Sequence, residues 1–466
     1  MTGAMLDRLK YFVTPFDRRY EDMNRGNWYK IAFRDVSAGL IVAMMAIPMA
    51  MGFAMASGLR PEHGIVAGAV AGMVGALFGG SKYNVYGPVA ALIPVIADIM
   101  ASYATPADPF AGHSYLVLIC VASAPFLLAV GMLGWGRIGN LVPHSVVVGF
   151  SVGIAVTIAV TQLGEVLGLK GAVSGSFVHR VELLWQHAHE FKWAALLIAG
   201  ITFAIIRLLL MVSIYIPAPL IAIGVATLLA STVLVDQNLS IIRTKYGEIP
   251  TNFLQITPPS MPSWDLAVVG ELAYYALAFA FVCGFESILA ARMGDRMANN
   301  RGTPYNPDKE FWGQGLIQLV VPLLNGMPLS GALARTATNI KAGAVTPLAG
   351  IMKCVLKLLM AYFLAHELGM VPMACIGGIL LWVASNMVKP AEIREIISHS
   401  RFHTFLMTYT ALAVIFKGFL FGVLTATLIY AVLHKRLDPP GADPTDPTGG
   451  AAKDDGTQPA AAAVHV

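Results

Sequence analysis

The chain is dominated by a succession of apolar stretches, about fourteen in all, and several are shorter than the ~20 residues that one helical span of a bilayer needs. Only 12% of the 466 residues are Asp, Glu, Lys or Arg, whereas soluble domains carry about 25%. So few charges cannot build a water-facing shell, and the lipid bilayer must therefore be the solvent for most of the chain. We predict an all-α polytopic membrane protein.

The apolar stretches divide into two sets of seven. Their approximate boundaries are 35–57, 62–80, 85–101, 114–135, 142–166, 192–212, 216–235, 267–292, 309–325, 330–341, 346–366, 370–388, 401–416 and 418–434. This pattern predicts an N-terminal segment over 1–33, a transmembrane domain over 34–436 and a tail over 437–466 that lacks the apolar content to fold. Polar residues 167–191 are expected to form an interfacial helix that joins the halves.

Basic side chains flank the transmembrane domain on both sides. Lys and Arg residues between Arg8 and Arg34 precede the first span, and His434, Lys435 and Arg436 follow the last. Because cytoplasmic segments of membrane proteins carry an excess of Lys and Arg, both termini are expected in the cytoplasm. We expect a multi-pass protein of the inner membrane of a bacterium.

Two short segments interrupt the apolar pattern at corresponding places in the two halves. Residues 84–91 read Asn-Val-Tyr-Gly-Pro-Val-Ala-Ala, and residues 326–337 read Gly-Met-Pro-Leu-Ser-Gly-Ala-Leu-Ala-Arg-Thr-Ala. Paired broken helices point to an inverted repeat and to the binding site of a transporter. Each half-helix N-terminus offers unpaired N–H groups and the positive end of the helix dipole, which suit an anion. The candidate ligand positions are Gly87, Pro88, Val89, Ser330, Gly331 and Ala332.

Arg335 is the cation of the second broken segment. Because helical side chains lean toward the N-terminus, its guanidinium can reach the start of its own half-helix and act as a counter-charge for the anion. An alternative is a salt bridge to Glu286 that joins two spans. The two interpretations are compatible if Arg335 and Glu286 pair in the empty protein and separate when the anion binds. Thr336 and Thr338 are of a type that more often bonds back to helix carbonyls than to ligands.

Glu286 lies deep in the eighth apolar stretch. A carboxyl group at that depth is costly unless it faces a polar cavity or a partner, and such groups are functional by default. We favour proton binding at Glu286 over a sodium site, because its own helix offers only Ser287 as a further oxygen nearby. The alternative is a structural carboxylate that a neighbouring helix end caps.

The first span contains Pro48 and Phe53. Pro48 removes a backbone hydrogen bond in the middle of the span. Phe53 offers the electropositive edge of its ring to an anion, although simple packing explains this residue equally well.

The chain gives no indication of enzyme or cofactor chemistry. Its four cysteines lie in apolar runs without the spacing of metal sites, which is typical of buried thiols. No pairing of a nucleophile with a base appears at intramembrane depth. The net charge of +4 gives no indication of nucleic acid binding. We expect no cofactor apart from a coupling ion, with a proton preferred to sodium.

Several motifs resemble those of the sulfate permease (SulP) family, in the same order and over roughly residues 28–435. They are Asp35–Leu40 with Ile47–Pro48 at the first span, Gly87–Ala90 at the third, Val142–Phe150 with Gln162 at the fifth, Phe285–Ser287 at the eighth, and Gly326–Ala337 with Ala342–Gly350 at the tenth and eleventh. The resemblance implies fourteen helices in two inverted seven-helix repeats, divided into a core and a gate, with half-helices three and ten. It places the anion between the half-helix N-termini, lined by the first and eighth helices, and it implies an elevator movement and a homodimer.

Three features depart from the family pattern. The glutamine that usually follows the first-span proline is Met49, and the tyrosine four residues later is Phe53. Both changes remove hydrogen-bonding groups from the expected pocket, so the usual substrate does not transfer directly. A cytoplasmic STAS domain normally follows the last span, and we expect none here because residues 437–466 stand in its place.

These features favour a secondary active transporter of a small anion, such as sulfate, bicarbonate or a short dicarboxylate, by proton-coupled symport. A nucleobase permease of the related seven-plus-seven fold is an alternative, against which Arg335 and the loss of a glutamine at Met49 argue. A passive anion channel is another, and electroneutral uptake driven by pH would distinguish the transporter from it. The expected partners are the anion, membrane lipids and a second copy of the chain, with no nucleic acid.

Overall fold

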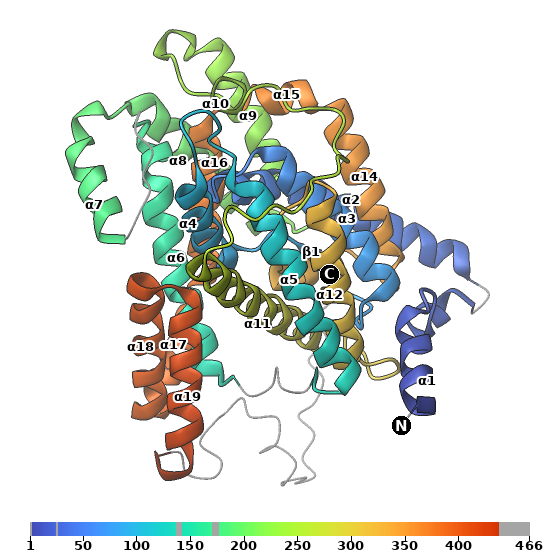
Figure 1. The fold of residues 1–466 in the computed structure, drawn as a ribbon. Coiled ribbons are helices and arrows are strands. Elements are labelled where there is room, and N and C mark those ends of the chain that lie inside the picture. The colour runs from blue at the N-terminus through green and yellow to red at the C-terminus, as the bar shows by residue number, and fades with distance from the viewer. Residues whose placement is uncertain (1, 25–26, 137–141, 170–176, 438–466) are drawn as a thin grey trace.

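The computed structural model describes residues 2–24, 27–136, 142–169 and 177–437. These residues are mostly helical, with loops between the helices and one short antiparallel pair of strands, β1 (Tyr86–Gly87) and β2 (Ser330–Gly331), near the centre of the molecule (Figure 1). Each predicted span corresponds to one helix: α2 (Trp28–Ala56), α3 (Pro61–Phe78), α4 (Ile93–Tyr103), α5 (Gly112–Leu133), α6 (His144–Leu167), α8 (Trp193–Val212), α9 (Ala218–Thr232), α11 (Leu266–Met297), α12 (Pro307–Leu323), α13 (Leu333–Lys341), α14 (Leu348–Phe363), α16 (Met373–Met387), α18 (Arg401–Lys417) and α19 (Phe419–Leu437).

Seven of the described helices are long and apolar enough to cross a membrane, and shorter apolar helices include the half-helix at Ala90–Tyr103. Two long helices extend beyond the spans predicted from hydropathy. α2 begins at Trp28 rather than 35, and α11 ends at Met297 rather than 292. Both extensions contain charged residues, which suit the membrane surface. Because charged residues interrupt the apolar pattern, hydropathy alone ends the predicted spans before the helices themselves end.

Short helices connect the spans. They are α7 (Phe177–Gln186), α10 (Ile242–Tyr246), α15 (Ala365–Gly369) and α17 (Pro390–His399). α7 falls within the interfacial link predicted over 167–191, of which residues 170–176 lie outside the described residues. The predicted tail also lies outside them, except for Leu437, which ends α19.

The spanning helices pack into two groups. The first group contains α2, α3, α5, α11, α12, α13 and α14, and the second contains α6, α8, α9, α16, α18 and α19. In Figure 1, α18 and α19 lie on one side of the molecule, and α12 and α14 lie on the other. α2 joins the groups through α9 and α16, and α4 contacts both α5 and α6. The half-helix α4 therefore lies where the two groups meet.

Close helix contacts in the first group depend on small residues. A Cβ atom at Gly64 of α3 would overlap the backbone carbonyl of Ala50 in α2. Small residues that let helix backbones approach closely are typical of membrane helix packing, where there is no hydrophobic force between helices.

The N-terminal segment folds back onto the first group. It contains α1 (Thr2–Val13) and a 3-10 helix, η1 (Arg18–Asn24). Between them, Asp17 forms ion pairs with Lys309 of α12 at 2.5 Å and with Arg19 at 2.8 Å. Burial alone would raise the pKa of Asp17, but the two cations and their hydrogen bonds outweigh burial and lower the pKa below its usual value.

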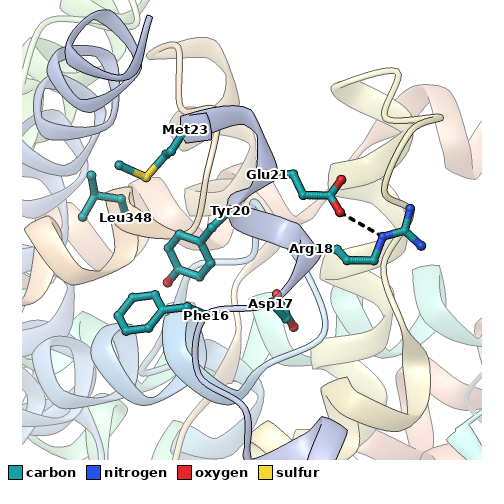
Figure 2. Close-up of a pocket in the computed structure, with 7 residues that line it drawn as sticks. All are labelled: Phe16, Asp17, Arg18, Tyr20, Glu21, Met23 and Leu348. Atoms are coloured by element: carbon teal, nitrogen blue, oxygen red, sulfur yellow. Dashed lines mark hydrogen bonds and ion pairs between the residues drawn. The ribbon is translucent and has the colours of Figure 1, made fainter. Parts of the chain in front are cut away.

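A pocket of about 580 Å³ lies between η1 and the first residue of α14 (Figure 2). Its lining residues are Phe16, Asp17, Arg18, Tyr20, Glu21, Met23 and Leu348. Arg18 and Glu21 form an ion pair of 3.1 Å at one side of it. None of these residues belongs to the two broken segments, so the pocket is separate from the site that the sequence predicts.

Candidate functional site

The two broken segments meet as an antiparallel ladder, in which Tyr86 of β1 is opposite Gly331 of β2. The ladder extends beyond the strands, because the Ala332 N–H donates to the Val85 carbonyl at 2.9 Å. Each strand leads directly into a half-helix. The pairing therefore brings the N-termini of two half-helices from opposite halves of the chain to one place, as the sequence predicts.

Neither half-helix has a side-chain cap at its N-terminus. Val89 precedes the short 3-10 helix η2 (Ala90–Leu92), which continues into α4, and Ala332 precedes α13. Both cap residues have an extended backbone and an apolar side chain that cannot accept a hydrogen bond. The first-turn N–H groups and the positive ends of the two dipoles thus remain available to another acceptor.

Glu310 of α12 holds the first broken segment in place. Its carboxylate accepts hydrogen bonds from Asn84 Nδ2 at 2.6 Å, from the Tyr86 hydroxyl at 2.7 Å and from the Gly80 N–H at 2.8 Å. The side chain is fully buried, and these three donors offset the cost of removing a carboxylate from water. The sequence analysis did not include Glu310 in the site.

Ser287 and Gln314 hold the second broken segment. The Gly331 N–H donates to Ser287 Oγ at 2.9 Å, and Ser287 Oγ donates to Gln314 Oε1 at 2.8 Å. The Gln314 amide in turn donates to the Leu329 carbonyl at 2.7 Å. Backbone groups on both sides of Ser330 are therefore bonded to side chains of α11 and α12, which fixes the position of β2.

Arg335 connects the second broken segment to the first. Its guanidinium donates a hydrogen bond to the carbonyl oxygen of Pro88, and a Cβ atom at Gly87 would overlap its Nη1 atom. Glycine at position 87 therefore makes room for the guanidinium. Arg335 is only 6% exposed and lies at the junction of the half-helices, where the sequence analysis expects it, although its contact with a substrate stays a prediction.

Glu286 lies next to the same junction. The Ser330 hydroxyl donates to Glu286 Oε2 at 2.5 Å, and Arg335 is close enough to interact with Glu286 electrostatically. The contacts described for these residues contain no direct ion pair between Glu286 and Arg335, which bond to Ser330 and Pro88 instead. The simple salt bridge considered as an alternative is therefore not what the structure contains.

Pro48, Met49 and Phe53 are buried in α2. Met49 and Phe53 belong to the same continuous apolar cluster as Val89 at the start of the first half-helix. None of the three side chains has a hydrogen-bond donor. They can line a site with apolar surface, but they offer no hydrogen-bond donor to a ligand.

Thr336 does not follow the expected pattern. Its hydroxyl accepts from the Val85 N–H at 3.0 Å and donates to Asn84 Oδ1 at 3.2 Å, so it joins the two broken segments rather than bonding to its own helix. Thr338 does bond back, to the Ala334 carbonyl at 3.1 Å. The difference arises because β1 passes beside the first turn of α13, where Thr336 meets an N–H group that the β1–β2 ladder does not bond.

Two buried lysines of α14 were missed from the sequence. Lys353 Nζ donates to the Tyr86 carbonyl at 2.8 Å, and Lys357 Nζ lies 3.4 Å from the Gly64 carbonyl. Lys353 is 2% exposed and Lys357 is fully buried. The signal was present, since two lysines four residues apart interrupt an apolar run and ionisable residues within spans are functional candidates by default.

Comparisons with known proteins identify the family of the chain. A model of the sulfate permease family matches residues 33–410. The chain is 34% identical over 422 residues to the "Putative sulfate transporter YvdB" of Bacillus subtilis, which covers 90% of this chain and 76% of the relative. It is 27% identical over 372 residues to the "Bicarbonate transporter BicA" of Picosynechococcus sp., which covers 77% of this chain and 63% of the relative.

Solved structures show the same fold. The transmembrane domain of a cyanobacterium bicarbonate transporter, BicA, matches with a TM-score of 0.72 at 24% identity, over 85% of this chain and 97% of that chain. The structure of SLC26A9 matches with a TM-score of 0.76 at 17% identity, over 92% of this chain and 69% of that chain.

These likenesses confirm the predicted fold class, a multi-pass membrane domain of two inverted seven-helix repeats. The family and these relatives are transporters and not enzymes, as the sequence analysis expects. The family model covers most of the chain, and a relative with 34% identity extends over nine-tenths of it. The chain therefore belongs to the sulfate permease family.

Proposed function

We propose that the chain is a secondary active transporter of a small anion, with sulfate, bicarbonate and short dicarboxylates as the candidate substrates. The observation that carries the proposal is the meeting of two uncapped half-helix N-termini, with Arg335 bonded across their junction. Backbone N–H groups and a guanidinium are the donors that oxyanions prefer. Relatives named as sulfate and bicarbonate transporters support the same substrate class.

Glu286 is the proposed proton carrier. The Ser330 hydroxyl lies within hydrogen-bonding distance of Glu286 Oε2, and an ionised Glu286 would accept the hydrogen of that hydroxyl. A protonated Glu286 can donate to Ser330 instead, which frees the hydroxyl hydrogen to point toward an anion at the half-helix junction. Protonation would in this way add a donor to the site, which couples proton binding to anion binding without a further cofactor.

The proposed transport step is an elevator movement of the first helix group against the second. Both broken segments and their supports on α11 and α12 belong to the first group, so the site would move as one unit. We place the protein in a bacterial inner membrane with both termini in the cytoplasm, and we propose a homodimer as its assembly.

The proposal is tested first by ligand-induced stabilisation of the purified protein. Sulfate, bicarbonate, chloride, nitrate, succinate, fumarate and uracil are compared at two pH values, because a ligand that binds the native state raises its unfolding temperature. We expect one or more anions to stabilise the protein, and more strongly at the lower pH. Stabilisation by uracil alone, or by no anion, would contradict the proposal.

Two variants test the residue roles in proteoliposomes. Arg335→Ala should lose anion binding. The matched control, Arg207→Ala at an exposed position of α8, should keep it. Glu286→Gln should still bind the anion but no longer accumulate it when a pH gradient is imposed. Accumulation by Glu286→Gln with unchanged pH dependence would remove Glu286 from coupling, and uptake that never responds to the gradient would favour a channel.

A further inference from the structure

Two buried basic side chains, Lys353 and Arg335, bond to the backbone of the first broken segment, and a third, Lys357, lies nearby and bonds to the Gly64 carbonyl of α3. Lys353 donates to the Tyr86 carbonyl and Arg335 donates to the Pro88 carbonyl. Because alternate peptide groups of an extended chain point the same way, the Tyr86 carbonyl in β1 and the Pro88 carbonyl directly after it are expected on the same side of the chain. Lys357 lies one helical turn beyond Lys353 on the same face of α14.

The neighbouring helix α3 is shaped to receive the two ammonium groups. A Cβ atom at Gly72 would lie 2.7 Å from Lys353 Cε, and a Cβ atom at Gly68 would overlap Lys357 Nζ. The same hypothetical atom at Gly68 would lie 3.6 Å from Pro88 Cδ, which places Lys357 close to the first broken segment as well. Glycines four residues apart on α3 thus leave room for lysines four residues apart on α14, so the two lysines pack directly against α3.

The two lysines lack the counter-charge that other buried lysines have. Lys309 pairs with Asp17 at 2.5 Å and Lys82 pairs with Asp22 at 2.7 Å. Among the described residues, no carboxylate lies within 4.0 Å of Lys353 or Lys357.

The charged neighbours of the two lysines are cations. Each lysine interacts electrostatically with the other and with Arg335. The nearby carboxylates are engaged elsewhere, Glu286 by Ser330 and Glu310 by three donors. Burial beside other cations favours the neutral form of a lysine, and an anion bound nearby would stabilise the charged form.

We propose that Lys353 and Lys357 form a cationic backing behind the first broken segment that makes the site prefer a doubly charged oxyanion to a singly charged one. This inference rests on the proposed function, because it assigns the missing anion to the transported substrate. The Coulomb energy between a lysine and the anion is proportional to the charge of the anion. Each lysine therefore strengthens binding of a dianion twice as much, on a logarithmic scale, as binding of a monoanion, and burial limits screening by salt.

The test compares sulfate with nitrate by titration calorimetry on the purified full-length chain. In Lys353→Met and Lys357→Met, we expect the affinity to fall about tenfold for nitrate and about a hundredfold for sulfate, because the loss scales with anion charge. The sulfate-to-nitrate affinity ratio then drops about tenfold for each lysine. Lys341→Met, at the exposed end of α13, is the matched control and should leave both affinities unchanged.

Two further measurements separate the role of charge from a role in folding. Lys353→Gln keeps a donor for the Tyr86 carbonyl but removes the charge, so it should reproduce the selectivity change of Lys353→Met while the unfolding temperature stays near that of the parent protein. Equal losses for sulfate and nitrate, or full selectivity in Lys353→Gln, would overturn the inference. A parent protein that binds neither anion would instead contradict the proposed function, so the two failures are distinguishable.

Discussion

Gly87→Ala is expected to weaken anion binding although the substitution adds only a methyl group. The backbone of Gly87 does not adopt a positive φ, so alanine brings no conformational penalty there. The new Cβ would lie 3.1 Å from Arg335 Cζ and 3.4 Å from Nη2, and it would overlap Nη1. The guanidinium must therefore retreat from β1 and lose its hydrogen bond to the Pro88 carbonyl.

The size of the effect follows from the two terms involved. Crowding a packed interior by one methyl group costs about 1–3 kcal/mol, and losing a hydrogen bond that involves a charged group costs about 1.5–3 kcal/mol. Both of these costs lower the stability of the folded protein. Anion affinity falls because the displaced guanidinium loses a charge-assisted hydrogen bond to the anion, which is worth about 1.5–3 kcal/mol, or roughly tenfold to a hundredfold in affinity.

A double-mutant cycle with Arg335→Ala tests whether the effect acts through the guanidinium. The measurements are sulfate affinity by calorimetry and the unfolding temperature without ligand, which remains measurable if binding is lost. In the Arg335→Ala background, Gly87→Ala has room for its methyl group and should have little further effect. Gly200→Ala in α8, where a Cβ meets nothing within 4 Å, is the control. Additivity of Gly87→Ala and Arg335→Ala within about 0.5 kcal/mol would refute the reasoning.

Three further substitutions test the supports of the site. Glu310→Gln should lower the free energy of unfolding by about 2–4 kcal/mol in a denaturation experiment, because an amide cannot accept from all three donors and loses the charge. Asp17→Asn should cost about 2–3 kcal/mol at pH 7. Arg19 and Lys309 hold the folded-state pKa of Asp17 below its unfolded value, so this stabilisation is complete above about pH 4, and the difference between Asp17→Asn and the parent should vanish as the pH falls through the folded-state pKa. Gly64→Ala should lower the free energy of unfolding by more than about 2 kcal/mol, because the new Cβ atom meets the rigid backbone of α2. The unfolding temperature should fall accordingly, and an unchanged unfolding temperature would contradict the close contact.

The spans and the half-helices could be predicted from the sequence because the bilayer imposes a simple rule on it. Every spanning segment has to be apolar, so hydropathy finds each helix, and Gly87, Pro88 and Pro328 stand out because they break helices inside that pattern. The errors occur where the rule ends. The additional turns at Trp28 and Met297 contain charges that suit the membrane surface, and hydropathy does not distinguish them from a loop.

The partners within the site could not be predicted because they depend on which helices are neighbours. Glu310 is a favourable first-turn charge when α12 is considered alone, and only the packing of α12 beside β1 shows that it accepts from Asn84 and Tyr86. Thr336 was misjudged for the same reason. Lys353 could have been found, since a lysine within an apolar run requires an explanation whatever its neighbours are.

Under the proposed function, the charges around the two broken segments would connect the charge of the substrate to proton coupling. The described charged groups bonded to these segments or close to them are the cations Arg335, Lys353 and Lys357 and the carboxylates Glu286 and Glu310. With all five ionised they leave one positive charge, which a monoanion neutralises. A dianion overshoots by one charge, and protonation of Glu286 restores neutrality, which a buried site favours strongly.

Sulfate binding should therefore take up about one proton and nitrate binding almost none, because only the dianion leaves an excess negative charge in the buried site. Calorimetry in buffers of different ionisation enthalpy measures this uptake directly. Glu286→Gln should abolish the uptake with sulfate, whereas equal proton uptake with both anions would show that coupling does not follow from charge balance at this site.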